Sequence, residues 1–263
     1  MKLSVSDIAW TKEYDKEMYC FLADEGLQGL EIAPTRIFPE LPYEKLKDAA
    51  SYANELRQEF GLVIPSMQSI WFGRSENIFV SEEERKELLI YTKKAIDFAA
   101  TIGCGNLVFG CPRNRTYTDE SMLGVEIPFF EELGEYAFKK GTVLSMEANP
   151  VIYNTNYCNT TLEALELVKT VASPGFKINL DMGTMIYNKE DMHVVDAARE
   201  WINHIHISEP GLAPIEKRDI HTELARYLEE TAYDGFVSLE IKTQENIQNV
   251  KGMIHYLQEV FGR

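Results

Sequence analysis

The chain has 263 residues, 45% of them hydrophobic, and 42 acidic against 26 basic side chains give it a formal net charge of −16. So acidic a surface repels nucleic acid and anionic lipid, and no stretch approaches the roughly 18 consecutive apolar residues of a membrane span. The first residues lack the long apolar run of a signal peptide, so we expect a cytoplasmic protein with one large core.

Strands and helices alternate through the first half of the chain. Apolar runs predict strands at residues 3–10, 29–33, 62–69 and 106–110, and helical spacing predicts helices at residues 14–25, 43–60, 81–101 and 127–140. Ser81 with Glu84 forms a capping-box pattern at the start of the third helix. The prolines that follow the second strand, Pro34, Pro39 and Pro42, predict a long irregular loop.

The second half repeats this alternation. Strands are predicted at residues 142–148, 176–182, 202–208 and 236–241, and helices at residues 161–171, 191–200, 220–231 and 246–260. Eight strand–helix units in strict alternation imply an all-parallel sheet, and eight is the number that closes into a (β/α)8 barrel. We therefore predict an α/β fold, a single barrel domain over residues 1–263, with functional residues at the carboxyl ends of the strands.

Four strands of the second half end in the same pattern: a polar residue, an apolar residue and then a potential metal ligand. These ligands are Glu147, Asp181, His206 and Glu240, and successive ones are about one strand–helix unit apart, roughly 30 residues. In an extended chain they point away from their apolar neighbours, so parallel strands would aim all four at one point. Three carboxylates and one imidazole suit a divalent ion such as Mn, Co, Mg or Zn. Without a thiolate, a closed structural zinc site is disfavoured.

Each ligand also has a plainer interpretation. A single strand-ending carboxylate or histidine usually caps a helix or faces solvent, and only the common register of all four favours a metal centre. His204 shares the inward face of its strand with His206, and we interpret it as a hydrogen-bonded interior residue beside the site rather than as a fifth ligand. Trp71 could wall a sugar-binding cavity, and a plain packing role fits it equally well.

With these residues in hand, the sequence resembles the xylose isomerase-like TIM barrels, and within them the sugar phosphate isomerase/epimerase group that includes the tagatose 3-epimerases. The resemblance covers essentially the whole chain and implies one divalent metal ion held by Glu147, Asp181, His206 and Glu240. It also implies that Glu209, three residues after the histidine, lies near the substrate.

Two positions depart from that family's pattern. Thr184 stands three residues after the aspartate, where family epimerases often have a histidine. Gly211, Leu212 and Ala213 stand where a substrate-binding arginine is common. The resemblance therefore implies metal binding more directly than it implies a particular substrate.

The chemistry expected of such a site is sugar isomerisation or epimerisation through a metal-stabilised enediolate, with Glu147 and Glu240 as the acid/base pair. They could instead be ligands only. Four arginines follow predicted strands, and they suggest an anionic substrate or simple surface ion pairs: Arg36, Arg74, Arg113 and Arg115. The expected partners are sugars, sugar phosphates or sugar acids, with neither nucleic acid nor membrane, and homo-oligomerisation stays open.

Three other functions compete with this expectation. Dehydratases of inositol or shikimate derivatives resemble the same scaffold and also begin with proton abstraction beside a carbonyl. An endonuclease IV-like hydrolase needs more histidine ligands, including some from the first half of its chain, whereas all five histidines here follow residue 190. A non-catalytic sugar-binding protein would have little use for the ligand quartet.

Overall fold

Eight parallel strands form one barrel in the computed structural model, which describes residues 1–262. The strands are β1 (Lys2–Ser6), β2 (Gly29–Glu31), β3 (Ser66–Met67), β4 (Asn106–Phe109), β5 (Val143–Glu147), β6 (Phe176–Asp181), β7 (Ile202–Ile207) and β8 (Phe236–Leu239). Each strand except β2 pairs with the next along the chain, and β8 pairs with β1. The seam between β2 and β3 is closed by isolated bridges, with Leu30 N donating to Val63 O at 2.9 Å. The predicted (β/α)8 TIM barrel is confirmed.

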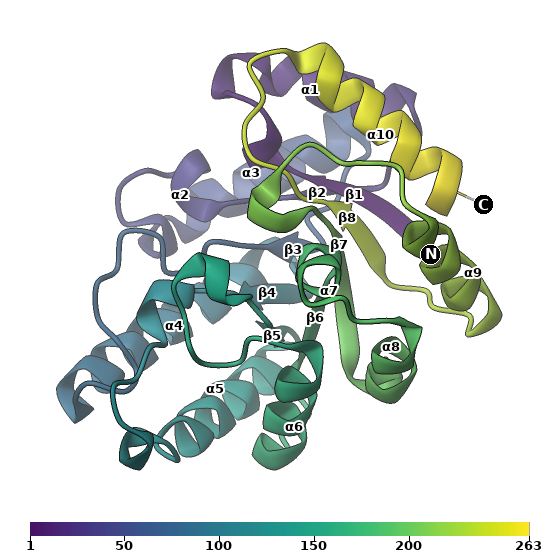
Figure 1. Ribbon diagram of the computed structural model, residues 1–263. Helices are drawn as coiled ribbons and strands as arrows, with labels where there is room; N and C mark the ends of the chain where they lie inside the picture. Colours follow the sequence, from purple (N-terminus) through teal and green to yellow (C-terminus); the bar gives the residue numbers. More distant parts are fainter. Residues whose placement is uncertain (263) are drawn as a thin grey trace.

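Helices surround the strands (Figure 1). They are α1 (Asp15–Asp24), α2 (Pro34–Ile37), α3 (Leu46–Phe60), α4 (Glu82–Ile102), α5 (Glu126–Lys140), α6 (Thr161–Val171), α7 (Met182–Asn188), α8 (Met192–Ala198), α9 (Asp219–Glu230) and α10 (Ile247–Phe261). Within residues 1–262, none of these helices is both long enough and apolar enough to cross a membrane.

The alternation of side chains along the strands divides the barrel into an apolar outer layer and a polar interior. The apolar residue that precedes each predicted ligand is buried to 1% exposure or less in the hydrophobic core: Met146, Leu180, Ile205 and Leu239. The interior neighbours are polar and bonded to one another. For example, Ser238 Oγ contacts both Ser4 Oγ and His204 Nε2. This interior fixes the height and direction of the side chains at the barrel mouth.

The segments after the first two strands differ from prediction. The first strand ends at Ser6, and a 3-10 turn, Asp7–Ala9, replaces its expected continuation. The loop after β2 was expected to be irregular, which is wrong, because α2 begins at Pro34 and a 3-10 turn begins at Pro42. Proline at the first position of a helix has no N–H to leave unpaired, so it starts helices as readily as it ends them.

Two further differences bear on the site. The third strand was predicted over residues 62–69, but only Ser66 and Met67 form a strand, since Pro65 interrupts the segment. Helix α7 was not predicted, and its N-terminal cap is Asp181, whose carboxylate accepts from Thr184 N at 2.6 Å.

The capping box predicted at Ser81 is half formed. The Ser81 side chain accepts from Glu84 N, but the Glu84 carboxylate accepts from the backbone N–H of Asn77 instead of returning to Ser81.

Candidate metal centre

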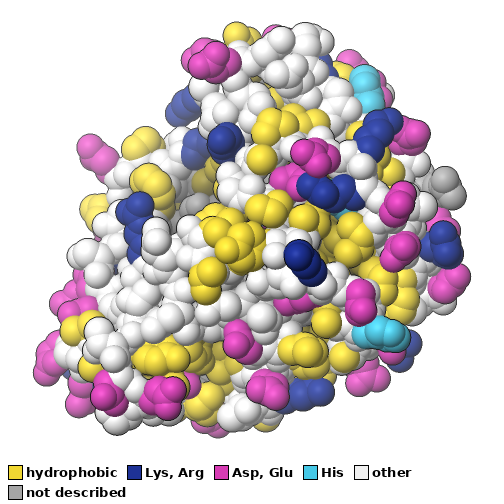
Figure 2. Space-filling view, viewed as in Figure 1, with side chains coloured by type: hydrophobic (Ala, Val, Ile, Leu, Met, Phe, Trp, Pro, Cys, Tyr) yellow, Lys and Arg dark blue, Asp and Glu magenta, His cyan; other side chains and the backbone are white. Residues whose placement is uncertain are grey.

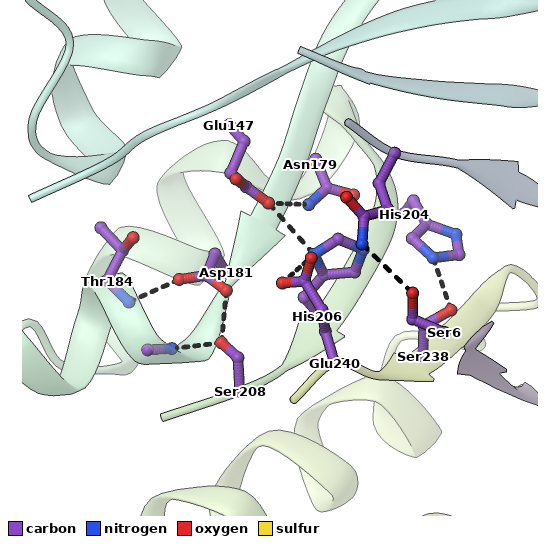
Figure 3. Close-up of polar contacts among 12 residues, drawn as sticks. Ser6, Glu147, Asn179, Asp181, Thr184, His204, His206, Ser208, Ser238 and Glu240 are labelled. Carbon is purple, nitrogen blue, oxygen red and sulfur yellow. Dashed lines mark hydrogen bonds and ion pairs between the residues drawn. The ribbon is translucent and has the colours of Figure 1, made fainter. Parts of the chain in front are cut away.

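The four predicted ligands meet at the mouth of the barrel. Glu147 and Asp181 are the last residues of β5 and β6, His206 is the penultimate residue of β7, and Glu240 follows β8 directly. The parallel register places Asp181 opposite His206, while Glu147 lies opposite Asn179 and His206 lies opposite Ser238, two residues before Asp181 and Glu240. One ligand atom from each of the four lies within 4.8 Å of the others, and Figure 3 shows the side chains converging.

His206 is the centre of this quartet. Its Nδ1 lies 3.0 Å from Glu147 Oε1 and 3.1 Å from Glu240 Oε2. On the opposite side of the ring, Nε2 lies 2.9 Å from the fully buried Glu31 Oε2. A carboxylate can only accept, so Nε2 carries a hydrogen, and Nδ1 is the nitrogen that can bind a cation once it gives up its own proton. Glu31 therefore sets both the tautomer and the orientation of the imidazole.

The carboxylates of the quartet are held by neutral donors. Glu147 Oε1 accepts from Asn179 Nδ2 at 2.9 Å, and Oε2 accepts from Asn149 Nδ2 at 3.0 Å. Asp181 accepts from Thr184 N and from the Ser208 hydroxyl. These donors fix the positions of the oxygens without cancelling their negative charge.

The arrangement fits a divalent cation. The exposed fractions of Glu147, Asp181 and Glu240 are 7–9%, and His206 is fully buried. His206 Nδ1 has no hydrogen-bond partner among residues 1–262, although two carboxylate oxygens lie about 3 Å away. A ring nitrogen that faces carboxylates in a buried site needs a positive species between them, either a proton or a metal ion. Three carboxylates and one imidazole are the donors that Mn, Co, Mg or Zn accept.

The crowding of acidic groups shifts their pKa values. Burial, together with nearby Glu147 and Glu31, raises the pKa of Glu240 to about 7, although His206 opposes the shift. Burial and Glu147 raise the pKa of Asp181 to about 6. Burial favours neutral His206, but Glu31 and Glu240 outweigh it and raise the imidazole pKa well above its usual value. A bound cation would relieve the mutual repulsion that these directions report.

A cavity of about 200 Å³ opens above the quartet, and Glu147, Asp181 and Glu240 line it. Gly110, at the end of β4, also lines it and leaves space for Glu147. A Cβ at Gly110 would lie only 2.8 Å from Glu147 Oε2, inside van der Waals contact. The cavity thus joins three carboxylates to a space of small-molecule size.

Comparison with known proteins identifies the family. The family model described as a xylose isomerase-like TIM barrel matches residues 21–260. The chain belongs to this family. No curated protein sequence matches it significantly.

Three solved structures illustrate the likeness. A D-psicose 3-epimerase has a TM-score of 0.81 at 14% identity, with 100% of both chains covered. The 3-keto-D-glucoside 4-epimerase from E. coli has a TM-score of 0.79 at 18% identity, covering 98% of this chain and 99% of its own. A probable 3-DHS dehydratase from Bacillus anthracis has a TM-score of 0.72 at 17% identity, with 98% and 99% covered. At these identities the likeness concerns the fold.

Two other predicted site residues of this xylose isomerase-like barrel have partners within the protein. Glu209, 2% exposed, forms a two-pronged ion pair with Arg218, with Nε and Nη2 each 2.7 Å from a carboxylate oxygen. It also accepts from Glu216 N at 3.1 Å, so it anchors the loop after β7. His204 lies in the barrel interior, with Nε2 2.8 Å from Ser238 Oγ, and does not line the cavity. Their substrate-binding roles stay predictions.

Trp71 and Arg113 lie beside the metal-site cavity. Trp71 is 2% exposed, and its indole N–H donates to Thr92 Oγ1 at 2.8 Å, which is the packing arrangement. Arg113 is exposed and lines a neighbouring cleft that Trp71 also borders. Contact of either with a substrate stays a prediction.

The remaining arginines near the mouth are engaged by the protein itself. Arg36 pairs with Asp7 and Asp15, and Arg74 pairs with Glu76. The acidic side chains spread over the surface in Figure 2 offer many such partners. These ion pairs give Arg36 and Arg74 structural roles and weaken the sequence argument for an anionic substrate.

Arg115 is fully buried. It donates to Glu147 O at 2.9 Å and to Asn149 Oδ1 at 2.5 Å. The same Asn149 side chain donates to Glu147 Oε2, so Arg115 supports a predicted ligand from below. It holds the strand end in place rather than facing the cavity.

Sequence reasoning missed two residues of the site, Glu31 and Tyr153. Glu31 ends the Gly29–Glu31 strand, directly after the apolar Leu30, as the four ligands do in their own strands. Tyr153 lines the cavity, and its hydroxyl accepts from Gly211 N at 2.9 Å, which joins the loops after β5 and β7. Nothing in the local sequence marks Tyr153, since it lies in a loop whose path the pattern does not determine.

Proposed function

We propose that the protein is a divalent-metal-dependent sugar or sugar-phosphate isomerase/epimerase. The observation that carries the proposal is the pair of carboxylates, Glu147 and Glu240, about 3 Å from His206 Nδ1 on either side and lining one small cavity. The similar structures named as sugar epimerases support it. The residues that would hold the metal are Glu147, Asp181, His206 and Glu240.

When bound, the cation would supply charge stabilisation to the oxygen that becomes negative as a carbon beside a carbonyl loses its proton. The protein supplies the proton transfer. One carboxylate removes the carbon-bound proton on one face of the sugar, and the other, in its acid form, returns a proton to the opposite face. The two groups then exchange protonation states, and solvent restores them. Such positioned acid/base catalysis typically contributes about 10²–10⁴-fold.

The surroundings of the two glutamates differ in a way that suits this division. Glu147 accepts a hydrogen bond at each oxygen, from Asn179 and from Asn149, so its carboxylate is held in one position, as a base requires. The Glu240 carboxylate has one close polar contact among the described residues, to His206 Nδ1, and no amide donor fixes it. A carboxyl with so few fixed partners can take up a proton and return it as the acid.

The test is to incubate metal-reconstituted protein in D2O with ketoses, sugar phosphates and keto-inositols and to follow the substrates by NMR. Deuterium should enter the carbon beside the carbonyl, and a change of configuration should accompany it. Glu147→Gln and Glu240→Gln should each abolish exchange while retaining part of the metal affinity. Glu131→Gln, an exposed glutamate of α5, is the matched control.

The outcomes separate the alternatives. Undiminished exchange in both variants would refute the acid/base assignment. Loss of water without a change of configuration would favour a dehydratase, the activity named for one of the similar structures. Binding of sugar to metal-free protein with no exchange would favour a binding protein.

A further inference from the structure

A second cleft adjoins the metal-site cavity. Its volume is about 480 Å³, more than twice the 200 Å³ of the cavity above the quartet. Ser69, Cys111 and Pro112 line both spaces, so the two are adjacent at the barrel mouth. The loops after β3 and β4 build this cleft, on the side of the barrel that contributes no ligand to the quartet.

Two of the side chains that line the cleft, Phe72 and Arg113, are exposed to solvent. Phe72 is 70% exposed, although its phenyl ring is large and apolar. Arg113 is exposed and has no ion pair among residues 1–262, although the chain carries 42 acidic side chains. An exposed aromatic ring beside a free guanidinium is a combination that binds rings carrying oxygen atoms.

The floor of the cleft is fixed. Trp71 closes it, held by the bond from its indole N–H to Thr92 Oγ1. Asn114 donates through Nδ2 to Arg74 O at 3.2 Å and to Glu76 O at 2.7 Å, which ties the β4 loop to the β3 loop. These bonds fix the two loops on either side of the cleft.

A phosphate group fits this cleft poorly. Anion sites present several converging N–H donors, but the guanidinium of Arg74 is already bound by Glu76 and lies 3.4 Å from Glu87. Arg113 is the one cation lining the cleft that lacks a carboxylate partner among the described residues. A terminal phosphate would also leave most of the volume empty.

We propose that this cleft holds a second ring carried by the reacting sugar. Phe72 packs against the apolar face of that ring, and Arg113 donates hydrogen bonds to an oxygen on it. The substrate class is then a glycosylated or otherwise ring-bearing keto sugar, with its carbonyl end in the metal-site cavity. The inference rests on the proposed function for the identity of the reacting end. A sugar ring and an aromatic aglycone share the required chemistry.

The experiment compares four ketoses with the same reacting end in D2O: fructose, 6-O-glucosylfructose, 6-O-benzylfructose and fructose 6-phosphate. We expect kcat/KM for exchange to be at least tenfold higher for one or both ring-bearing ketoses than for fructose. The better of the two identifies the ring as a sugar or an aglycone. Equal kcat/KM for fructose and both ring-bearing ketoses, or a preference for the phosphate alone, would overturn the proposal.

Substitutions in the cleft test whether Phe72 and Arg113 cause the preference for ring-bearing ketoses. We define the preference as kcat/KM for the better ring-bearing ketose divided by kcat/KM for fructose. Phe72→Ala and Arg113→Met should each lower this ratio by about tenfold. Phe138→Ala and Arg226→Met are the controls, since both side chains are exposed on outer helices, and they should leave the ratio unchanged. An unchanged ratio in Phe72→Ala and Arg113→Met would also contradict the proposal.

A binding measurement separates this inference from the proposed function. 6-O-Glucosylsorbitol has no carbonyl and cannot react, so its binding, followed by NMR line broadening, does not depend on catalysis. If no ketose exchanges but this compound binds about tenfold more weakly to Phe72→Ala, the proposed function fails and the ring site stands. If ketoses exchange and the compound binds both proteins equally, the ring site fails alone.

Discussion

The two halves of the barrel are built differently. Strands β5 to β8 have four to six residues each, pair along their length with one register shift between β6 and β7, and carry the four residues of the quartet at or directly after their ends. In the other half, β2 and β3 have three and two residues, and isolated bridges close the seam between them. Side chains on strands are held more precisely than those on loops, and loops vary more freely. The regular half thus suits a metal cage, and the irregular half suits substrate discrimination.

Two residues cross from the irregular half to support the regular one. Glu31, at the end of β2, orients His206, and Arg115, after β4, holds the backbone of Glu147. The halves are therefore not independent. Four substitutions test how strictly the work is divided between them.

The largest effect should come from His206→Gln. This change removes the only nitrogen of the quartet, and loss of the charge stabilisation by a metal, several kcal/mol, corresponds to about 10³-fold in kcat/KM. Metal content by mass spectrometry and exchange in D2O should fall together. His193→Gln, an exposed histidine of α8, is the control. Full activity in the His206 variant would show that the regular half is not the catalytic one.

Glu31→Gln should have the next largest effect. An amide can still accept from His206 Nε2, but it no longer supplies the negative charge that strengthens the imidazole as a ligand. Removing such supporting partners typically lowers metal affinity by about 10–100-fold. Isothermal titration of metal-free protein measures this directly. Unchanged affinity would mean that the irregular half contributes nothing to the cage.

An effect of similar size, on catalysis rather than on metal affinity, is expected from Gly110→Ala. The added methyl group would lie 2.8 Å from Glu147 Oε2 and must displace that carboxylate. Misplacing a catalytic group by about 1 Å can cost about 10²-fold, so we expect kcat/KM to fall about 10- to 100-fold with little loss of stability. Gly252→Ala, in α10, meets no atom within 4 Å and should leave kcat/KM unchanged. Equal activity in the two variants would argue against a positional role for Glu147.

The difference between the halves also decides what could be predicted from the sequence. The quartet could be predicted because one pattern recurs at the ends of four neighbouring strands, so each occurrence supports the others. Glu31 also follows an apolar residue at a strand end, but Gly29 stands where the pattern has a polar residue, its strand has no ligand-bearing neighbour, and its contact with His206 spans 175 positions. That contact follows only from closure of the barrel.

Local signals failed where tertiary structure overrides them. Pro34 reads as a helix breaker, but it begins α2. Residues 62–69 have the apolar composition of a strand, but Pro65 and the seam between β2 and β3 leave only Ser66 and Met67 paired as a strand. The cleft beside Phe72 depends on how two loops meet, which periodicity does not encode.

The irregular half should also give the stability of the fold, rather than its activity, a pH dependence. Asp7, fully buried after β1, accepts from Ala33 N at 3.0 Å and lies 3.5 Å from Arg36 Nη1. Burial raises its pKa from 3.8 to about 7, although Arg36 opposes the shift. Between those values the folded chain binds more protons at this group than the unfolded chain, so the free energy of unfolding falls as pH rises toward 7 and then levels off.

Asp7→Asn removes this dependence, because an amide does not ionise. Relative to the wild type, the variant should gain about 2–3 kcal/mol in free energy of unfolding between pH 5 and pH 8, measured by urea titration. Asp15→Asn removes a partly exposed carboxylate from the same Arg36 and is the matched control. If the free energy of unfolding changes with pH in the same way in the wild type and in Asp7→Asn, Arg36 keeps Asp7 ionised. The buried charges of the irregular half would then form a true ion pair rather than a neutral hydrogen-bonded anchor.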